Sequence, residues 1–146
     1  MMKLFSYVLL LCAIATSLYA QFDYNNYEYD QLYTSNQKSI IYVFYNSQDC
    51  QYTQYCPQAI ELVESVYDQY FMDKYEFLII DYYQDGEYNF IYRYKLSSPV
   101  VMVLQAVEYG QPTAYKKFPA LQNFAYDPIS FKQNIYNQIV SFFSNV

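Results

Sequence analysis

Two cysteines, Cys50 and Cys56, are the residues of this chain whose type and spacing point most directly to chemistry. A thiolate attacks disulfides, so the pair could be a reversible dithiol centre in which Cys50 attacks and Cys56 resolves the mixed disulfide. The same pair could instead be a fixed disulfide that braces a loop. The sequence leaves both interpretations open.

The spacing of the two cysteines restricts the structure around them. On one continuous α-helix, six residues rise by about 9 Å, and the two side chains point in different directions. A disulfide needs Cα atoms within about 7 Å of each other. A bond therefore requires residues 50–55 to form a loop, with the helix starting near Pro57, because proline suits the first turn of a helix.

Other kinds of reactive site are excluded or weakly indicated. The chain has no histidine, which excludes Ser-His-Asp and Cys-His catalysis and every histidine metal site. Its two glycines, Gly86 and Gly110, cannot build a glycine-rich phosphate loop. Asp81, Asp85 and Glu87 could ligate a hard cation, but they lack the spacing of an EF-hand and are typical of a solvated turn. We therefore expect no metal and no cofactor.

Residues 1–20 have the pattern of a secretory signal peptide. Lys3 supplies the positive charge, Phe5–Ala15 the apolar stretch, and Ala20 a small residue before the cleavage point. An uncleaved anchor is the alternative, although Leu4–Ala20 gives only 17 residues, the short limit of a membrane span. We expect cleavage, no stable membrane insertion afterwards, and export to an oxidising compartment: secreted, periplasmic or the lumen of the endoplasmic reticulum.

Charge and cysteine content limit the partners of the remaining chain. After Gln21 there are 14 acidic and 7 basic residues, a net charge of −7. This charge repels phosphate backbones, so we expect no nucleic-acid partner. Cys12 would be lost with the signal, and two remaining cysteines in an exported protein suggest a disulfide. The expected partners are exported polypeptides or another thiol protein.

The spacing of apolar residues along the chain predicts the strands and helices that position the cysteines. Short apolar runs predict buried strands at Ile40–Tyr45, 77–80 and 100–104, and a strand at 113–118 can pair back after a turn. Helical spacing predicts helices at about 57–71, 88–94 and from Pro128 onward, the last with Asp127 as its N-cap. Residues 21–37 form a polar leader rich in tyrosine and asparagine, and residues 38–146 form one domain. Because helices separate the first three strands, we expect those three to be parallel and the fourth antiparallel.

This order of elements resembles the thioredoxin-like superfamily over about residues 38–146. The first predicted strand runs into a cysteine, IIYVFYNSQDC, and Ser98-Pro99 stands just before the strand VVMVL. The resemblance implies an α/β fold with a central mixed sheet of about four strands, three parallel and one antiparallel, flanked by helices. It also implies that Cys50 lies at a helix N-terminus and faces a cis-proline at Pro99. An ordinary trans turn proline is the alternative.

The resemblance further implies an exported thiol–disulfide oxidoreductase, with Ser98 and Pro99 holding substrate backbone beside the sulfur. The chain departs from the usual Cys-x-x-Cys motif, because Thr53 stands where the second cysteine would be. Phe44 replaces the buried acid of thioredoxins, and the flanking tryptophans are absent. The alternative is a non-catalytic protein-binding module of this fold with a structural disulfide. A third possibility is a secreted structural protein that associates through its leader.

Overall fold

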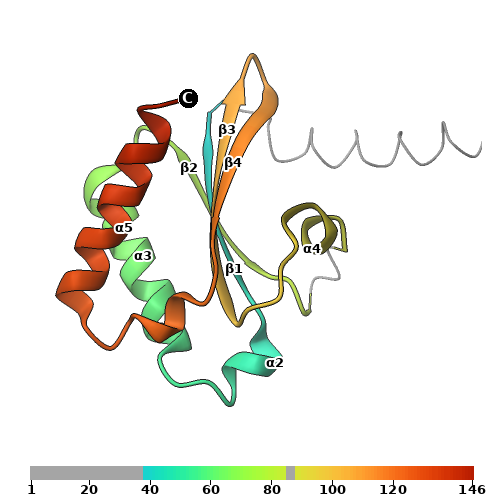
Figure 1. Cartoon of the computed structure of the whole chain (residues 1–146), viewed down its shortest axis with the longest axis vertical. Helices are drawn as coiled ribbons and strands as arrows, with labels where there is room; N and C mark the ends of the chain where they lie inside the picture. The colour runs from blue at the N-terminus through green and yellow to red at the C-terminus, as the bar shows by residue number, and fades with distance from the viewer. Residues whose placement is uncertain (1–37, 85–87) are drawn as a thin grey trace, which may run out of the picture. The chain divides into compact units, whose positions relative to one another are not determined.

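The computed structural model describes residues 38–84 and 88–146. The predicted signal peptide, the leader up to residue 37, and Asp85 and Glu87 lie outside the described residues. Four strands form one sheet in the order β2-β1-β3-β4 (Figure 1). The strands are β1 (Ile40–Tyr45), β2 (Glu76–Asp81), β3 (Val100–Glu108) and β4 (Gln111–Phe118). Each predicted strand is therefore present, with β3 and β4 longer than the apolar runs alone indicated.

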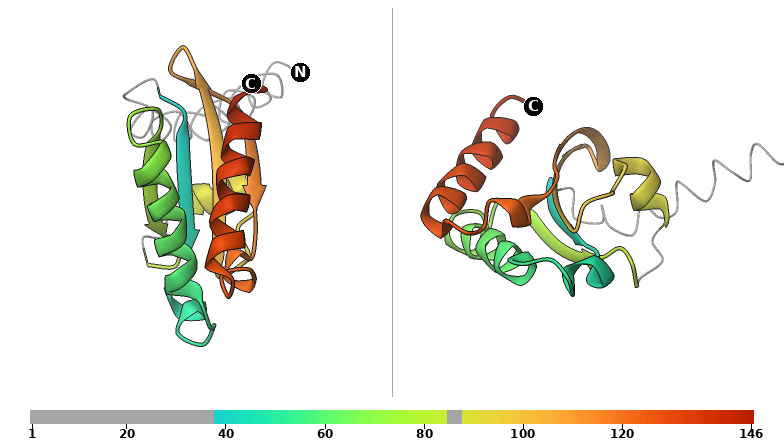
Figure 2. Two further views of the ribbon diagram at one scale, coloured as in Figure 1. Left: turned by 90° about the vertical axis from the view of Figure 1, so that its left-hand side faces the viewer. Right: turned by 60° about the horizontal axis from the view of Figure 1, so that its bottom comes forward.

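Two long helices cover one face of the sheet, and a short helix covers the other (Figures 1 and 2). The long ones are α3 (Cys56–Tyr70) and α5 (Pro128–Phe143), and the short one is α4 (Tyr88–Tyr94). A four-residue helix, α2 (Ser47–Cys50), follows β1, and a 3-10 turn, η1 (Leu121–Asn123), precedes α5. Among the residues that the structure describes, no helix combines the length and the apolar character needed to cross a membrane.

The two faces of the sheet are packed with different side chains. On the α3–α5 face, aliphatic residues such as Val63 of α3, Met102 of β3 and Ile139 of α5 are fully buried. On the α4 face, the rings of Tyr42 and Phe44 lie 5.2–5.6 Å from that of Phe90. Burial of each such side chain contributes about 1.5–3 kcal/mol, so both faces hold the strands in place.

The sheet has one parallel pair rather than three parallel strands, which corrects the prediction. β1 pairs with β2 in parallel, but β1 pairs with β3 antiparallel. The connection over residues 82–99, which includes the seven residues of α4, begins and ends beside the end of β1. β3 therefore starts at the end of the sheet where β1 and β2 finish, and it runs back against β1. Backbone bonds at that end confirm this, with Asn46 N donating to Pro99 O at 2.9 Å and Tyr82 N to Tyr45 O at 3.0 Å.

Candidate functional site

The segment after β1 turns into α2 because Asn46 caps it. The Asn46 side-chain oxygen accepts hydrogen bonds from the backbone N–H groups of Gln48 at 3.0 Å and Asp49 at 3.1 Å. These bonds satisfy donors that the first turn of a helix leaves without partners. Cys50 is the last residue of this short helix, and its N–H donates to Asn46 O at 2.9 Å. The strand and its cap therefore fix the position of the first cysteine.

Cys50 and Cys56 form a disulfide, with their Cα atoms 5.5 Å apart. Residues 51–55 form turns between α2 and α3, as the bond was predicted to require. Tyr55 lies in the left-handed region, with φ of 67°, and reverses the chain so that α3 can begin at Cys56. Pro57 stands in the first turn of α3, as its sequence position indicated.

The implied position of Cys50 at a helix N-terminus is wrong. Cys50 ends α2, and Cys56 is the residue at the first position of α3. Residues 51–55 separate the two cysteines. Tyr55, the N-cap of α3, starts a new helix there instead of extending α2. The partial positive charge of the long helix N-terminus therefore acts on Cys56 rather than on Cys50.

Pro99 lies beside the disulfide but is not a cis-proline. The described residues contain no cis peptide bond, so the bond between Ser98 and Pro99 is trans. Cys50 Sγ is 3.6 Å from Pro99 O, so the predicted proximity of sulfur and proline is present. Pro99 O accepts from Asn46 N, and Val100 pairs with Tyr45, at the start of the antiparallel pairing between β1 and β3. The Ser98 carbonyl accepts a hydrogen bond from the Tyr82 hydroxyl at 2.9 Å.

A buried carboxylate, Asp81, stands at the end of β2. It is 7 % exposed, and its Oδ1 accepts from Ser47 N at 3.2 Å and from Tyr83 N at 3.1 Å. Burial alone would raise the pKa of Asp81, but the hydrogen bonds donated by Ser47 and by the following turn outweigh it and lower the pKa below 3.8. Asp81 therefore ties the start of α2 to the end of β2.

The sequence did not single out Asp81 for this role. The sequence pattern placed it in a solvated turn with Asp85 and Glu87, two residues that lie outside the described part of the chain. Phe44, which stands at the position of the usual buried acid, is fully buried in the aromatic cluster under α4. The sequence did contain a signal for Asp81, because an acid at the end of a predicted buried strand lies at the same end of the sheet as the cysteine loop.

A groove of about 460 Å³ opens beside the disulfide. Both cysteines line it, but Cys50 is only half-buried, whereas Cys56 is 0 % exposed. Residues of β1, β2, α2 with the turn after it, and α3 complete the lining, namely Tyr45, Ser47, Gln51, Pro57, Ile60, Glu61 and Ile79. Pro99 and Ser98, the predicted substrate-binding residues, do not line it. The groove therefore opens on the β2–α3 side of the sulfur, away from the proline.

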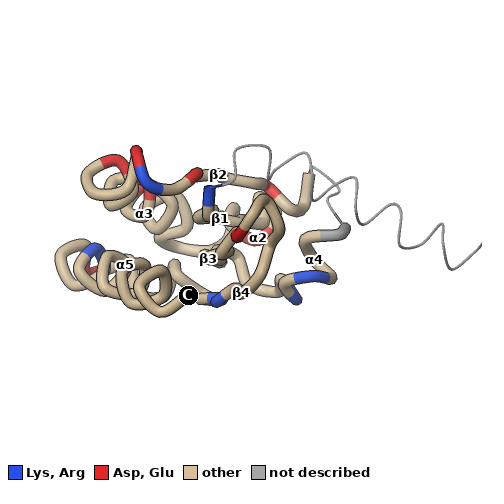
Figure 3. Tube along the Cα trace, turned by 90° about the horizontal axis from the view of Figure 1, so that it is seen from above, with Lys and Arg blue, Asp and Glu red and all other residues tan. Residues whose placement is uncertain are grey.

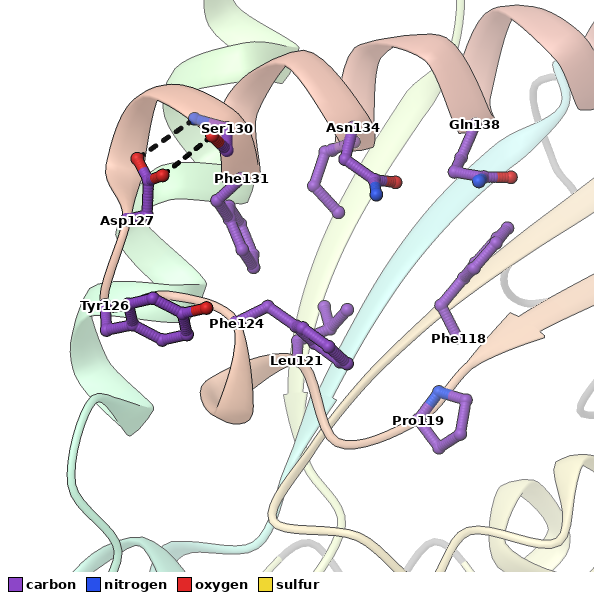
Figure 4. A pocket seen from close by; sticks show the side chains of 11 residues that line it. Phe118, Pro119, Leu121, Phe124, Tyr126, Asp127, Ser130, Phe131, Asn134 and Gln138 are labelled. Atoms are coloured by element: carbon purple, nitrogen blue, oxygen red, sulfur yellow. Dashed lines mark hydrogen bonds between the residues drawn. The ribbon is translucent and has the colours of Figure 1, made fainter.

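A larger hollow, of about 610 Å³, lies between the segment after β4 and α5 (Figure 4). Its wall is mainly apolar, with Phe118, Leu121 and Phe131 among the side chains that point into it. Asp127 and Ser130 at its end form the N-cap of α5, joined by a 2.7 Å hydrogen bond from the Ser130 hydroxyl. No residue of this hollow lines the disulfide groove, and it contains no thiol.

Comparisons with known proteins identify similar structures rather than relatives in sequence. No protein-family model matches the chain, and a search among curated proteins finds no match. The germline-specific thioredoxin Deadhead of Drosophila melanogaster is similar at 20 % identity and a TM-score of 0.48, over 77 % of this chain and 91 % of that one. Chloroplastic thioredoxin z is similar at 12 % identity and a TM-score of 0.42, over 73 % and 88 % of the two chains. A malarial protein is similar at 16 % identity and a TM-score of 0.39, over 66 % and 96 %.

The fold is thioredoxin-like. The mixed four-stranded sheet, the helices on both of its faces and the cysteine loop after β1 agree with the resemblance found in the sequence. At these scores and identities the similar structures say nothing of activity. Any function of this thioredoxin-like chain therefore has to be argued from its own disulfide and groove.

Proposed function

We propose that this chain is an exported thiol–disulfide oxidoreductase whose redox centre is the Cys50–Cys56 disulfide. The observation that supports it is the unequal accessibility of the two sulfurs. Both cysteines line the groove, but Cys50 is partly exposed, whereas Cys56 is 0 % exposed. An incoming thiolate can therefore approach Cys50, whereas the packing of α3 shields Cys56. Such a difference directs exchange to a single sulfur.

The exchange balances without a cofactor. A substrate thiolate attacks Cys50 Sγ, the Cys50–Cys56 bond breaks, and Cys56 leaves with the electron pair as a thiolate. A second substrate thiolate then attacks the substrate sulfur of the mixed disulfide, and Cys50 leaves as a thiolate. The substrate dithiol is oxidised by two electrons and the protein disulfide is reduced. In the reverse direction, the Cys50 thiolate attacks a substrate disulfide and Cys56 resolves the intermediate.

The N-terminus of α3 favours Cys56 as the leaving thiolate, and its burial in the core opposes the charge. Cys56 is the first residue of the 15-residue helix α3, and backbone N–H groups at a helix N-terminus stabilise negative charge. Cys50 instead lies 3.6 Å from the Pro99 carbonyl oxygen, which can accept a hydrogen bond from the neutral thiol. Asp49 is adjacent to Cys50, and its negative charge opposes ionisation of that thiol.

The alternative is a non-catalytic module in which the disulfide is a structural brace. One observation favours it: Cys56 belongs to the hydrophobic core, together with Ala59 and Val63 of α3. In that case the bond would only hold the 51–55 turn against the helix. Protein binding, rather than exchange, would then be the function of the groove.

The reduction potential of the Cys50–Cys56 pair, measured together with insulin reduction, separates the two functions. For an oxidoreductase we expect turnover that Cys50→Ser abolishes, and a mixed disulfide that accumulates in Cys56→Ala because the resolving thiol is gone. A potential below about −300 mV without turnover would favour the structural brace.

Export is the second part of the proposal, and it rests on the pattern of residues 1–20. We expect the exported protein to begin at Gln21, which N-terminal sequencing of protein recovered from the exported fraction would show. A chain that retains Met1 and stays with the cytoplasmic fraction would contradict export, whatever the outcome of the redox assay.

A further inference from the structure

We propose that Tyr82 is a positioning residue for the redox centre. It holds the segment Ser98–Pro99 so that the Pro99 carbonyl accepts a hydrogen bond from the Cys50 thiol once the disulfide is reduced. Because that bond exists only in the reduced chain, it favours transfer of electrons from substrate dithiols to the protein. This inference rests on the proposed function and adds the direction of the reaction and a residue that sets it.

The Pro99 carbonyl is the polar group that lies against the accessible sulfur. Cys50 Sγ is 3.6 Å from Pro99 O, within the range of a hydrogen bond to sulfur. In the disulfide this sulfur carries no proton, so the two atoms are only in contact. After reduction the Cys50 S–H can donate to Pro99 O. The same oxygen accepts from Asn46 N at 2.9 Å, and its two lone pairs allow both bonds.

Tyr82 connects the two segments that flank this contact. Its hydroxyl donates to Ser98 O at 2.9 Å and accepts a hydrogen bond from the Asn46 side chain. The side-chain oxygen of Asn46 caps α2, the short helix that carries Cys50. Tyr82 is 6 % exposed. One buried hydroxyl therefore ties the residue before Pro99 to the cap of that helix.

The Tyr82 hydroxyl remains a donor over the pH range in which thiols ionise. Burial raises the pKa of Tyr82 above its ordinary 10.0, and Asp49 and Asp81 add to the increase, although the hydrogen bond from Asn46 acts against it. An unperturbed thiol ionises at about pH 8.5. Tyr82 therefore keeps its own proton during exchange and acts on Cys50 only by holding its surroundings in place.

The charged groups around Cys50 also favour its neutral form. Asp49 is adjacent to it on α2, Glu61 of α3 lines the same groove, and Asp81 at the end of β2 holds the start of α2. Besides the two cysteines, the titratable groups of the described lining are Glu61 and Tyr45 of β1, and none is basic. The first residues of β3 contain no titratable side chain. Negative neighbours oppose ionisation of a thiol, so they act in the same sense as the Pro99 carbonyl.

The reaction balances with a dithiol substrate. The substrate loses two electrons and two thiol protons, and the S–S bond between Cys50 and Cys56 breaks. One proton ends on Cys50 and is shared with Pro99 O, and the other goes to Cys56 or to water. The hydrogen bond to Pro99 lowers the free energy of the reduced chain alone, so the pair becomes a better electron acceptor.

The test is the equilibrium of the full chain with glutathione or dithiothreitol redox buffers, in which mass spectrometry after acid quenching measures the Cys50–Cys56 disulfide. Tyr82→Phe keeps the buried ring and removes the hydroxyl. It should shift the equilibrium toward the disulfide by about 2- to 10-fold at neutral pH. At about 30 mV for each tenfold change, the reduction potential becomes about 9–30 mV more negative. Tyr83→Phe, at a neighbouring position 54 % exposed, is the matched control and should leave the equilibrium unchanged.

The pH dependence separates this role from a general loss of packing. The bond needs the Cys50 proton, so the difference between the native chain and Tyr82→Phe should disappear as the pH rises through the ionisation of Cys50. In Cys56→Ala, the pH profile of Cys50 alkylation by iodoacetamide locates that ionisation. Addition of Tyr82→Phe should move its midpoint to lower pH, because the neutral thiol has lost its acceptor. Equal equilibria at every pH, or a difference that persists at high pH, would overturn the inference.

Asn46→Ser is a second variant that tests the same connection. Serine retains a side-chain oxygen that caps α2 but loses the amide that donates to Tyr82. We expect a shift of the same sign as in Tyr82→Phe and smaller, because the bond to Ser98 remains. A shift in Asn46→Ser with none in Tyr82→Phe would assign the effect to the helix cap and contradict the role of Tyr82.

The outcomes distinguish this inference from the proposed function. Dithiothreitol buffers reach disulfides that glutathione does not reduce, so the effect of Tyr82→Phe is measured whether or not the chain turns over substrate. Absence of turnover together with the expected shift would contradict the oxidoreductase function alone. Turnover without any shift in Tyr82→Phe would contradict the role of Tyr82 alone.

Discussion

The two outer strands of the sheet, β2 and β4, differ in how they are protected. β4 carries Pro112, Lys116 and Lys117, and its pairing with β3 is interrupted by a register shift near Ala106. Prolines, lysines and bulges are features by which proteins prevent an edge strand from pairing with other chains. β2, with the sequence EFLIID, has no proline, no lysine and no register shift against β1. Within the described residues, β2 therefore lacks the features that protect β4, and its Ile79 lines the disulfide groove, which no residue of β4 does. Figure 3 shows acidic residues along α3 and β2, and most basic ones on α4, β4 and α5.

Of the two hollows, the smaller one contains the reactive group. The larger one, against α5, is mainly apolar and contains no thiol. The smaller one contains the accessible sulfur of a disulfide and lies beside acidic residues. The larger volume therefore does not mark the reactive site, because thiol–disulfide exchange needs an exposed sulfur and room for an approaching thiolate. We therefore expect substitutions on the β2–α3 side to affect exchange, and those on the β4–α5 side to affect stability.

The largest expected effect is the loss of exchange in Cys50→Ser. The accessible sulfur is the atom that a substrate thiol attacks, so no mixed disulfide can form there. The measurement is insulin reduction, with peptide mixed-disulfide formation followed by mass spectrometry. Phe124→Ala, at the rim of the other hollow and 60 % exposed in the native chain, is the control that should retain the full rate. Normal turnover in Cys50→Ser would remove the distinction between the two hollows.

A large loss of stability without loss of exchange is expected for Phe131→Ala. Phe131 is 4 % exposed and lines the larger hollow from α5. Truncation of a buried phenylalanine costs about 3–5 kcal/mol, which denaturant unfolding would measure. Ile129→Ala, at a position 84 % exposed, should change the free energy of unfolding by less than about 0.5 kcal/mol. A slower exchange rate in folded Phe131→Ala would show that the two sides are coupled.

A moderate, pH-dependent effect is expected for Asp81→Asn. The pKa of Asp81 lies below its ordinary value in the folded state, so the unfolded chain takes up the proton first as the pH falls. The stabilisation by the carboxylate is therefore complete well above pH 3.8 and is lost as the pH drops through the lower folded pKa. Asp81→Asn should cost about 1–3 kcal/mol at neutral pH and should flatten the acid limb of the stability curve.

Ser47→Ala offers a graded version of the same experiment. It removes the hydroxyl that helps to lower the pKa of Asp81 but retains the backbone N–H bond at 3.2 Å. The acid limb should therefore become shallower than in the native chain and remain steeper than in Asp81→Asn. An unchanged acid limb in both variants would show that Asp81 does not link β2 to α2 energetically.

The smallest expected effect is increased association of the chain through the outer strand β4. Replacing Lys116 and Lys117 by threonine removes two charges from β4, so this edge should pair with other chains more readily. We expect increased light scattering at high protein concentration, with little change in exchange. Arginine at both positions retains the charge and is the matched control. If the threonine variant does not associate, the register shift and Pro112 are sufficient to protect β4.

Local features of the sequence predicted much of the fold. Ile40–Tyr45 is a strand because its continuous apolar side chains are buried on both faces, and α5 begins where Asp127 and Pro128 indicated. The requirement that residues 50–55 leave the helix followed from the rise of a helix and the reach of a disulfide. Those inferences used only residues that are close together in the chain.

The errors came where distant residues decide the outcome. The direction of β3 depends on where residues 82–99 bring the chain back to the sheet, and the pattern of apolar residues did not show this. The Ser98–Pro99 bond is trans, whereas a proline in a sequence is compatible with either isomer.

The sequence by itself determined the elements, the cysteine pair and the loop that the pair needs, because periodicity, capping and short-range geometry act over a few residues. Only the tertiary structure decided which sulfur is accessible, which carboxylate holds α2 and which of the described strands lie at the edges of the sheet. These depend on packing between segments that are thirty or more residues apart, such as Asp81 with Ser47 and Cys50 with Pro99. Such contacts form because the whole sheet is buried, and a local sequence pattern does not predict them.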